Sequence, residues 1–275
     1  MSAPRPAAPP EPSPRPEATW NERGSDTGDP ALTRDEFAAA LRAQGARYWD
    51  KHPFHVRLHA GGCTPDEVRR WVLNRWYYQA NLSRKNAAII AACPLPEVRR
   101  RWAARLSFQD GQPGAASSAG AASSAGAAEL AGASGGLADW LVLARAVGVD
   151  PAEMTSLRHL LPGVRFAVDA YVAFCRTEPW EIGAAAALTE LFSPDLMHQR
   201  VLAWQRHYPW IDPAGYAYFQ ARIPVVQADS SDTLDLVLSH CRGRQRQEAA
   251  ITALAFKCDV LWGILDAVEH AGCGR

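Results

Sequence analysis

Residues 64–92, TPDEVRRWVLNRWYYQANLSRKNAAIIAA, determine the fold class of this chain. Thr64 followed three residues later by Glu67 is a capping box, and Pro65 occupies the first helical position. Apolar residues then recur every three to four positions: Val68, Trp71, Val72 and Trp76. The pattern predicts one long helix that continues to about Ala92, because a Cys-Pro pair follows it.

Helical patterns also occupy most of the remaining chain. Capping patterns begin at Thr33 and at Asp150, and Pro96 opens a helix through Leu106. Further helices are predicted over residues 137–147, 164–176, 179–192, 194–205, 213–221, 225–241 and 244–267. No Asn-Gly or Asp-Gly hairpin signal lies between alternating β-branched runs. The predicted class is all-α, a multi-helix bundle of about seven or more helices.

Composition excludes several classes of protein. The 275 residues include 29 Lys and Arg against 29 Asp and Glu, so there is no basic excess of the kind that nucleic-acid proteins show. We therefore expect no nucleic-acid partner. No run of 18 uncharged apolar residues predicts a membrane span, and no apolar leader is visible, so we expect a cytoplasmic protein with no membrane association. The six cysteines form no CxxC pair and are predicted to be free thiols.

Two segments have the composition of disordered chain. Residues 1–30 hold eight of the 20 prolines and bury too little apolar surface to fold. Residues 112–136 contain AASSAG twice in tandem, at 115–120 and 121–126, which predicts a flexible surface insertion. The predicted organisation is a disordered tail, then a single helical domain over residues 31–275 that carries this insertion.

Three histidines, His52, His55 and His59, lie at spacings that bring them near one helical face. Such a cluster can ligate a metal when carboxylates or further imidazoles join it. The chain has no HExxH motif, and the alternative is that these side chains cap the helix that Pro53 opens. We favour the structural role and predict no metal site.

One face of the 64–92 helix is unusually polar. Arg75, Tyr78 and Gln79 share it at i, i+3 and i+4, and Lys85 lies seven residues beyond Tyr78. Arginine binds carboxylates in a bidentate manner and tyrosine donates hydrogen bonds or stacks, so this face suits a planar polyanion. The alternative is an ordinary solvated face.

Further polar groups interrupt helices that are otherwise apolar. They are Tyr171, Glu190, Tyr218, Arg222 and Lys257, the last with Asp259 nearby. A carboxylate such as Glu190 in an apolar helix is either paired or has a raised pKa. Taken together, these cations and tyrosines are consistent with an internal anion-binding cavity in a helical bundle.

Five segments, in chain order, resemble motifs of the pyrroloquinoline-quinone (PQQ) synthase family, PqqC. They are WVLNRWYYQ at 71–79, LPGVRFAVDAY at 161–171, LTELF at 188–192, HYPWI at 207–211 and FKCDVLW at 256–262. The resemblance extends over about residues 33–267 and implies a heme-oxygenase-like, TENA-type fold and a homodimer. It also implies an enzyme without metal or flavin that closes a ring in the last PQQ precursor and oxidises it with O2, releasing peroxide. PQQ would be the product, and O2 and a small polycarboxylate the only other partners.

The resemblance also implies a set of site residues. Substrate-binding positions map to Tyr48, Arg75, Tyr78, Gln79, Lys85, Arg105, Arg200 and Lys257. Catalytic positions map to Tyr171, Tyr218, Glu190 and Arg222. In this assignment the cations hold the substrate carboxylates and favour electron-rich intermediates, and the tyrosines donate protons to nascent peroxide.

The chain departs from the family at three histidine positions, which here are Trp49, Gln109 and Met197. Glutamine hydrogen-bonds without titrating, and tryptophan only donates or stacks. One hypothesis is a working synthase in which the remaining tyrosines, Glu190 or His198 carry the protons. The alternative is a divergent paralogue that binds or oxidises a related polycarboxylate or quinone. A third hypothesis, a helical interaction module, does not explain the retained cations.

Overall fold

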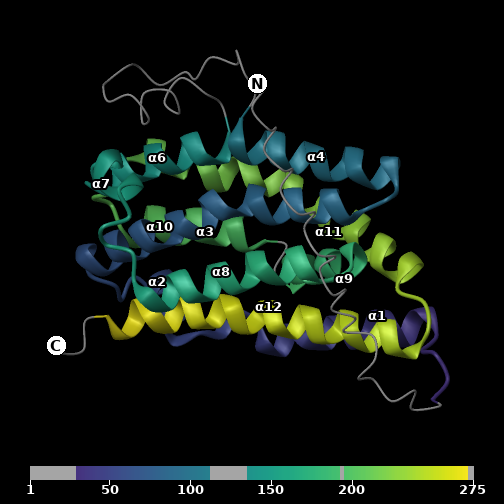
Figure 1. The fold of residues 1–275 in the computed structure, drawn as a ribbon. Coiled ribbons are helices and arrows are strands. Elements are labelled where there is room, and N and C mark those ends of the chain that lie inside the picture. The colour runs from purple at the N-terminus through teal and green to yellow at the C-terminus, as the bar shows by residue number, and fades with distance from the viewer. Residues whose placement is uncertain (1–28, 112–134, 193–194, 272–275) are drawn as a thin grey trace, which may run out of the picture.

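A computed structural model describes residues 29–111, 135–192 and 195–271. These residues form helices and turns and contain no strand, so the predicted all-α class is confirmed (Figure 1). The elements are α1 (Arg34–Ala43), η2 (Gln44–Arg47), η3 (Trp49–Lys51), α2 (Pro53–His59), α3 (Pro65–Ala92), α4 (Pro96–Asp110), α6 (Gly136–Ala146), α7 (Pro151–Thr155), α8 (Pro162–Thr177), α9 (Trp180–Ala185), η4 (Leu188–Phe192), α10 (Leu196–His207), η5 (Pro213–Tyr216), α11 (Ala217–His240) and α12 (Arg244–His270).

The helix starts follow the capping signals. Thr64 accepts from the Glu67 backbone N–H while the Glu67 carboxylate accepts from the Thr64 backbone, and Thr33 makes the same capping box at α1. The Asp150 side chain caps α7. Helix α3 spans Pro65–Ala92, as the sequence predicts, and Cys93 adopts an extended conformation immediately afterwards.

Helix α3 is central to the packing because it contacts α4, α6, α8, α9 and α12. Figure 1 shows α3, α4, α8 and α12 running side by side across the molecule. Trp71 of α3 packs against Trp140 of α6 and Trp204 of α10, with ring centroids 5.6 and 5.7 Å apart. Trp140 Nε1 also donates to the Val72 carbonyl oxygen at 3.2 Å. These contacts fix the polar face of α3 relative to the surrounding helices.

Two predicted helix boundaries are wrong. The single helix expected over 179–192 is divided into α9 and the tighter η4, because the Ala187 N–H bonds to Ala184 three residues back. The break expected between 221 and 225 is absent, and α11 runs through Pro224. Pro224 is exposed, so the carbonyl that loses its intrahelical donor can be solvated by water.

The predicted tail and insertion fall almost wholly outside the described residues. Within the described part, Gly136 already belongs to α6, so the helix begins one residue earlier than expected. The division into tail, domain and insertion therefore stays a prediction. Among the helices described, none combines the length and the apolar character that crossing a membrane requires.

Candidate functional site

One internal pocket collects every site residue implied by the sequence. Its lining includes Tyr48, Arg75, Tyr78, Gln79, Lys85, Arg105, Tyr171, Glu190, Arg200, Tyr218, Arg222 and Lys257. They come from the η2–η3 junction, α3, α4, α8, η4, α10, α11 and α12, so the pocket lies where most of the bundle converges. The helical spacing along α3 and the packing of its neighbours place these side chains together.

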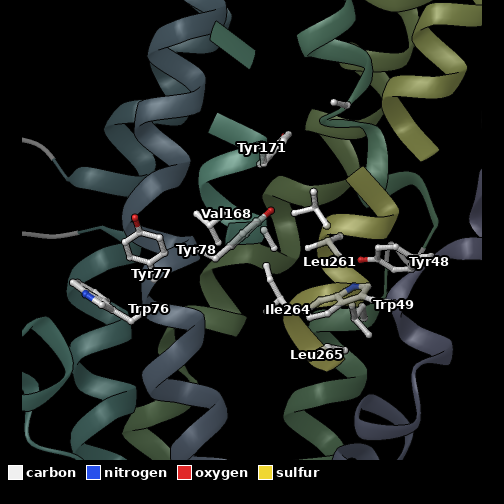
Figure 2. Packing of buried hydrophobic residues seen from close by; sticks show 14 of the residues in the cluster. Tyr48, Trp49, Trp76, Tyr77, Tyr78, Val168, Tyr171, Leu261, Ile264 and Leu265 are labelled. Carbon is white, nitrogen blue, oxygen red and sulfur yellow. The ribbon is translucent and has the colours of Figure 1, made fainter. Parts of the chain in front are cut away.

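The polar face of α3 points inward. Arg75, Tyr78, Gln79 and Lys85 are all buried, so the alternative of a solvated face is wrong. In Figure 2, Tyr48 and Trp49 lie on the right, Leu261 of α12 lies between them and Tyr78, and Tyr171 lies above Tyr78 near the middle. Burying an arginine or lysine without an anionic partner costs free energy, so these residues favour an anionic ligand in the pocket.

The pocket is strongly cationic. Six basic side chains line it, namely Arg75, Lys85, Arg105, Arg200, Arg222 and Lys257, and Glu190 is the one carboxylate among the described lining residues. Glu190 forms an ion pair with Arg222, which satisfies the expectation that this carboxylate is paired. Among the six basic side chains, Arg75, Lys85, Arg200 and Lys257 form no ion pair with a carboxylate of the described residues. A ligand with several carboxylates matches this excess of positive charge.

The two pocket lysines lie beside Tyr171. Lys257 Nζ donates to the Tyr78 hydroxyl at 2.8 Å and lies 3.7 Å from the centroid of the Tyr171 ring, while Lys85 Nζ lies 5.9 Å from it. Burial, reinforced by nearby cations, lowers the pKa of Lys257 well below its ordinary value and that of Lys85 to about 8. The expected proximity of Asp259 has no role here, because Asp259 is exposed and pairs with Arg47.

An amide chain connects Gln109 to Tyr218. Gln109 Nε2 donates to the Gln79 backbone oxygen at 3.1 Å and to Gln79 Oε1 at 3.4 Å, and the Tyr218 hydroxyl donates to the same Oε1 at 2.9 Å. Burial raises the pKa values of Tyr218 and Tyr171, so both phenols remain protonated near neutral pH. Both are therefore proton donors rather than bases in this pocket.

Two guanidinium groups share one indole ring at another part of the pocket. The Arg75 Cζ lies 4.5 Å and the Arg200 Cζ 5.5 Å from the centroid of the Trp49 ring. Burial and the nearby Arg75 lower the pKa of Arg200 to about 9. Cation–π contact with the ring partly offsets the cost of holding the two like charges close together.

The three positions where the family has histidine all lie in this pocket, because Trp49, Gln109 and Met197 belong to its lining. None of the described lining residues is histidine. His198, one residue beyond Met197, is exposed and lies outside the lining, so its proposed part in proton transfer is wrong. The 100° turn per residue of a helix accounts for the difference.

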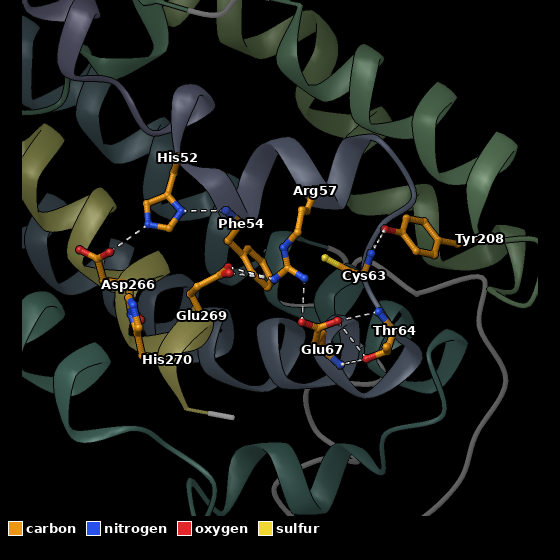
Figure 3. A network of polar contacts seen from close by, with 10 residues as sticks. All are labelled: His52, Phe54, Arg57, Cys63, Thr64, Glu67, Tyr208, Asp266, Glu269 and His270. Atoms are coloured by element: carbon orange, nitrogen blue, oxygen red, sulfur yellow. Dashed lines mark hydrogen bonds and ion pairs between the residues drawn. The ribbon is translucent and has the colours of Figure 1, made fainter. Parts of the chain in front are cut away.

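The three clustered histidines have structural roles. His52 Nδ1 accepts from the Phe54 N–H at the start of α2 and its Nε2 lies 3.1 Å from an Asp266 oxygen, which joins α2 to α12 (Figure 3). His55 and His59 stack with ring centroids 4.0 Å apart, and burial lowers the pKa of both. Over the described residues no group of three His, Cys, Asp or Glu side chains is arranged to hold a metal ion.

Sequence reasoning missed several lining residues. They are Leu82, Asn86, Trp140, Ala187, Thr189, Leu196 and Leu261. Leu82 and Asn86 follow Tyr78 and Gln79 by four and seven residues on α3, so helical periodicity was a usable signal for them. Trp140, by contrast, belongs to an apolar helix and is distinguishable from core only in three dimensions.

The fold and the pocket define a class, a heme-oxygenase-like helical bundle with a buried pocket lined by basic side chains. Solved structures with that fold include a TenA homolog from Pseudomonas syringae pv. tomato, with a TM-score of 0.64, 10% identity, and coverage of 88% of this chain and 97% of that one. Another, from Shewanella denitrificans, is described as a domain of unknown function with a heme oxygenase-like fold; it has a TM-score of 0.65 and 11% identity over 86% and 92% of the two chains.

The family follows from the sequence comparisons. The model of the TENA/THI-4/PQQC family matches residues 38–267, and this chain belongs to that family. It is 45% identical over 240 residues to a pyrroloquinoline-quinone synthase of Pseudomonas putida, covering 87% of this chain and 88% of that protein. It is 44% identical over 241 residues to the enzyme of that name from Pseudomonas aeruginosa, covering 88% and 89%.

Proposed function

We propose that this protein is an oxidoreductase of PQQ biosynthesis, which closes a ring in the last PQQ precursor and oxidises it with O2. The observation that carries the proposal is the buried pocket in which Arg75, Lys85, Arg200 and Lys257 have no carboxylate partner among the described residues, while Glu190 is already paired with Arg222. A precursor with several carboxylates supplies the missing negative charge. The likeness to enzymes named pyrroloquinoline-quinone synthase over most of the chain supports this assignment.

The same charges account for the chemistry. Cations around a bound polycarboxylate favour its electron-rich, deprotonated forms, and such forms can pass electrons directly to O2. Each two-electron oxidation of the ligand then reduces one O2, and two protons complete H2O2. Tyr171 and Tyr218 remain protonated and supply protons at the pocket wall, while Gln79 orients the Tyr218 hydroxyl.

The proposal includes the absence of a resident metal or flavin, so that O2 is the co-substrate and PQQ the product. Elemental analysis and absorbance spectra of the purified protein test this part, and stoichiometric metal or flavin would contradict it. We also propose a cytoplasmic homodimer that needs no nucleic acid or membrane. Light scattering during size-exclusion chromatography tests the dimer, and a monomeric mass would contradict it.

Anaerobic mixing with the precursor tests the function directly. We expect a spectral change on binding without O2, and then PQQ and peroxide once O2 is admitted. Binding followed by no turnover would instead support the divergent paralogue that holds a related polycarboxylate or quinone. No binding at all would contradict a ligand-binding role for the pocket.

A further inference from the structure

Met197 places the sulfur atom of a thioether in the wall of the pocket. It lies in the first turn of α10, is half-buried and packs against the hydrophobic core. Of the described residues that line the pocket, Met197 is the one that contains sulfur. Hydrogen peroxide converts a thioether into a sulfoxide, so Met197 presents a group that peroxide can oxidise.

The cysteine thiols of this protein are poorer targets for peroxide. The five cysteines among the described residues are all buried, and none of them lines the pocket. Cys175 lies one turn beyond Tyr171 on α8, and Cys258 follows Lys257 on α12. Burial raises the pKa of the Cys175 thiol and raises that of Cys258 to about 11. Because the thiolate is the reactive form, these protonated thiols react slowly.

The proposed function produces hydrogen peroxide in the same pocket. Each oxidation of the bound precursor reduces one O2, so peroxide forms among the lining residues before it reaches the solvent. Met197 and the new peroxide then share one small space, and their encounter no longer depends on diffusion through solution. Turnover itself therefore exposes Met197 to the oxidant.

We propose that Met197 is an oxidation site, which hydrogen peroxide in the pocket converts to methionine sulfoxide, and that the sulfoxide weakens ligand binding. The inference rests on the proposed function for the source of the peroxide. A sulfur lone pair forms a bond to one peroxide oxygen as the O–O bond breaks. The departing hydroxide takes the proton from the transferred oxygen. Sulfur loses two electrons and the peroxide gains two, so the products are the sulfoxide and one water.

Oxidation changes what Met197 offers the ligand. The thioether is apolar and flexible, whereas the sulfoxide is polar and its oxygen accepts hydrogen bonds. The same pocket holds basic groups without a carboxylate partner among the described residues, namely Arg75, Lys85, Arg200 and Lys257. A sulfoxide oxygen that engages one of these donors competes with a carboxylate of the ligand. Repeated turnover therefore lowers affinity until a methionine sulfoxide reductase restores the thioether.

The test compares Met197 with a surface methionine on the same helix. Leu202→Met supplies it, because Leu202 belongs to α10, is 53% exposed and does not line the pocket. Met154, which is 1% exposed, is the internal reference for a methionine in the core. Peptide mass spectrometry measures the fraction of each methionine that has gained one oxygen atom.

In the first experiment, hydrogen peroxide is added to the Leu202→Met protein with and without PQQ. We expect oxidation at Met197 and at position 202 ahead of Met154. PQQ at ten times its Kd leaves about one pocket in eleven free, so it should slow oxidation of Met197 about tenfold and leave position 202 unaffected. Met197 that stays reduced, or that PQQ does not protect, would overturn the inference.

In the second experiment, the Leu202→Met protein turns over the precursor while catalase removes peroxide from the solvent. We expect the sulfoxide at Met197 to increase with the amount of PQQ formed, while position 202 and Met154 stay reduced. Equal oxidation at Met197 and at position 202 would place the reaction in the solvent and overturn the pocket as its location.

Affinity for PQQ measures the consequence of oxidation. Peroxide treatment, followed by removal of the reagent, should weaken PQQ binding by the parent about fivefold, the scale of one hydrogen bond. Methionine sulfoxide reductase should restore it. Met197→Leu, compared with its own untreated sample, should bind PQQ equally well after treatment. A parent whose affinity is unchanged when Met197 is fully oxidised would contradict the effect on binding.

The two proposals fail in different ways. Formation of PQQ and peroxide while Met197 stays reduced retains the proposed function and overturns the oxidation site. Oxidation of Met197 by added peroxide that PQQ prevents, in a protein that does not turn the precursor over, retains the site and overturns the function. A protein that shows neither turnover nor PQQ-protected oxidation of Met197 overturns both.

Discussion

Lys257 Nζ donates to the Tyr78 hydroxyl oxygen at 2.8 Å, and Lys257 forms no ion pair with a carboxylate of the described residues. A cationic side chain on α12 is thus joined to α3 through a neutral phenol. The lysine is 1% exposed, and the cations around it oppose its protonation. We therefore expect Lys257 to contribute to ligand affinity without contributing to the stability of the unliganded protein.

Lys257→Met should weaken PQQ binding by about 2–4 kcal/mol, because the bound carboxylates lose a cationic partner. It should leave the unliganded protein at least as stable as the parent, because methionine has no charge to desolvate. Calorimetric titration and denaturant unfolding measure the two effects. Lys51→Met is the control, since Lys51 is exposed and outside the pocket.

If Lys257→Met instead binds PQQ with parental affinity, the lysine serves packing alone. A large loss of stability would mean that its hydrogen bond to Tyr78 outweighs the cost of burial. Either result contradicts the expectation that Lys257 contributes to ligand affinity but not to stability.

Affinity for PQQ should fall as pH rises through about 8. Burial lowers the pKa of Lys85 to about 8, so the side chain is cationic below that pH and neutral above it. Titrations between pH 6.5 and 9.5 measure the effect, and Lys85→Met should flatten the dependence in this window. A parent and a variant with the same pH profile would show that Lys85 does not contribute.

The lowered pKa of Lys85 has the opposite effect on the unliganded protein, whose free energy of unfolding should increase with pH. The unfolded chain binds the Lys85 proton up to its ordinary value of 10.5, while the folded protein releases it at about 8. The folded state is therefore penalised below pH 8, and the penalty fades as pH rises from 8 toward 10.5. The free energies of unfolding of the parent and of Lys85→Met should converge at high pH. Curves that stay parallel across this range would contradict the lowered pKa of Lys85.

Gln109→His should raise turnover if proton transfer is limiting. An imidazole at this position can keep a hydrogen bond to Gln79 while adding a group that titrates near 6.5. The rate should then acquire a pH dependence in that region. Met197→His and Trp49→His should act non-additively with it, because residues that work as a unit share one transition state.

A parent whose rate Gln109→His leaves unchanged would show that proton transfer is not limiting. Trp49→His is the less clean probe, because it also removes the aromatic ring beside Arg75 and Arg200. Steady-state rates for each variant against pH make the comparison.

Pro224→Ala should stabilise the protein by about 1–3 kcal/mol, since proline inside a helix removes a backbone hydrogen bond. Arg222 lies two residues before this position and lines the pocket. If the proline sets the local direction of α11 at Arg222, turnover should fall while stability rises. Unfolding curves and rates on the same variant separate the two effects. A destabilised Pro224→Ala would contradict this account of α11.

The helical elements were largely predictable because their signals are local. The capping box at Thr64 and the apolar period predicted that α3 starts at Pro65 and ends near Ala92, whereas Pro224 suggested a break that the exposed face of α11 does not need. The charged and tyrosine residues of the pocket were predictable from the resemblance, whereas lining residues such as Trp140 and Leu261 were not. The pairing of Glu190 with Arg222 was not, because it joins residues 32 positions apart in η4 and α11. The contacts of Arg75 and Arg200 with the Trp49 ring were not predictable either, because they join α3 and α10 to η3.

The basic side chains that line the buried pocket make the stability of the folded protein depend on the concentration of its ligand. A ligand that binds only the native state adds stability in proportion to the logarithm of its concentration, about 2.7 kcal/mol at a hundredfold excess over its Kd. Because the pocket lining holds like charges together, much of that gain comes from relieving the repulsion between them. Chains without ligand should therefore be digested by proteases first, so that substrate supply also governs how much of the protein persists.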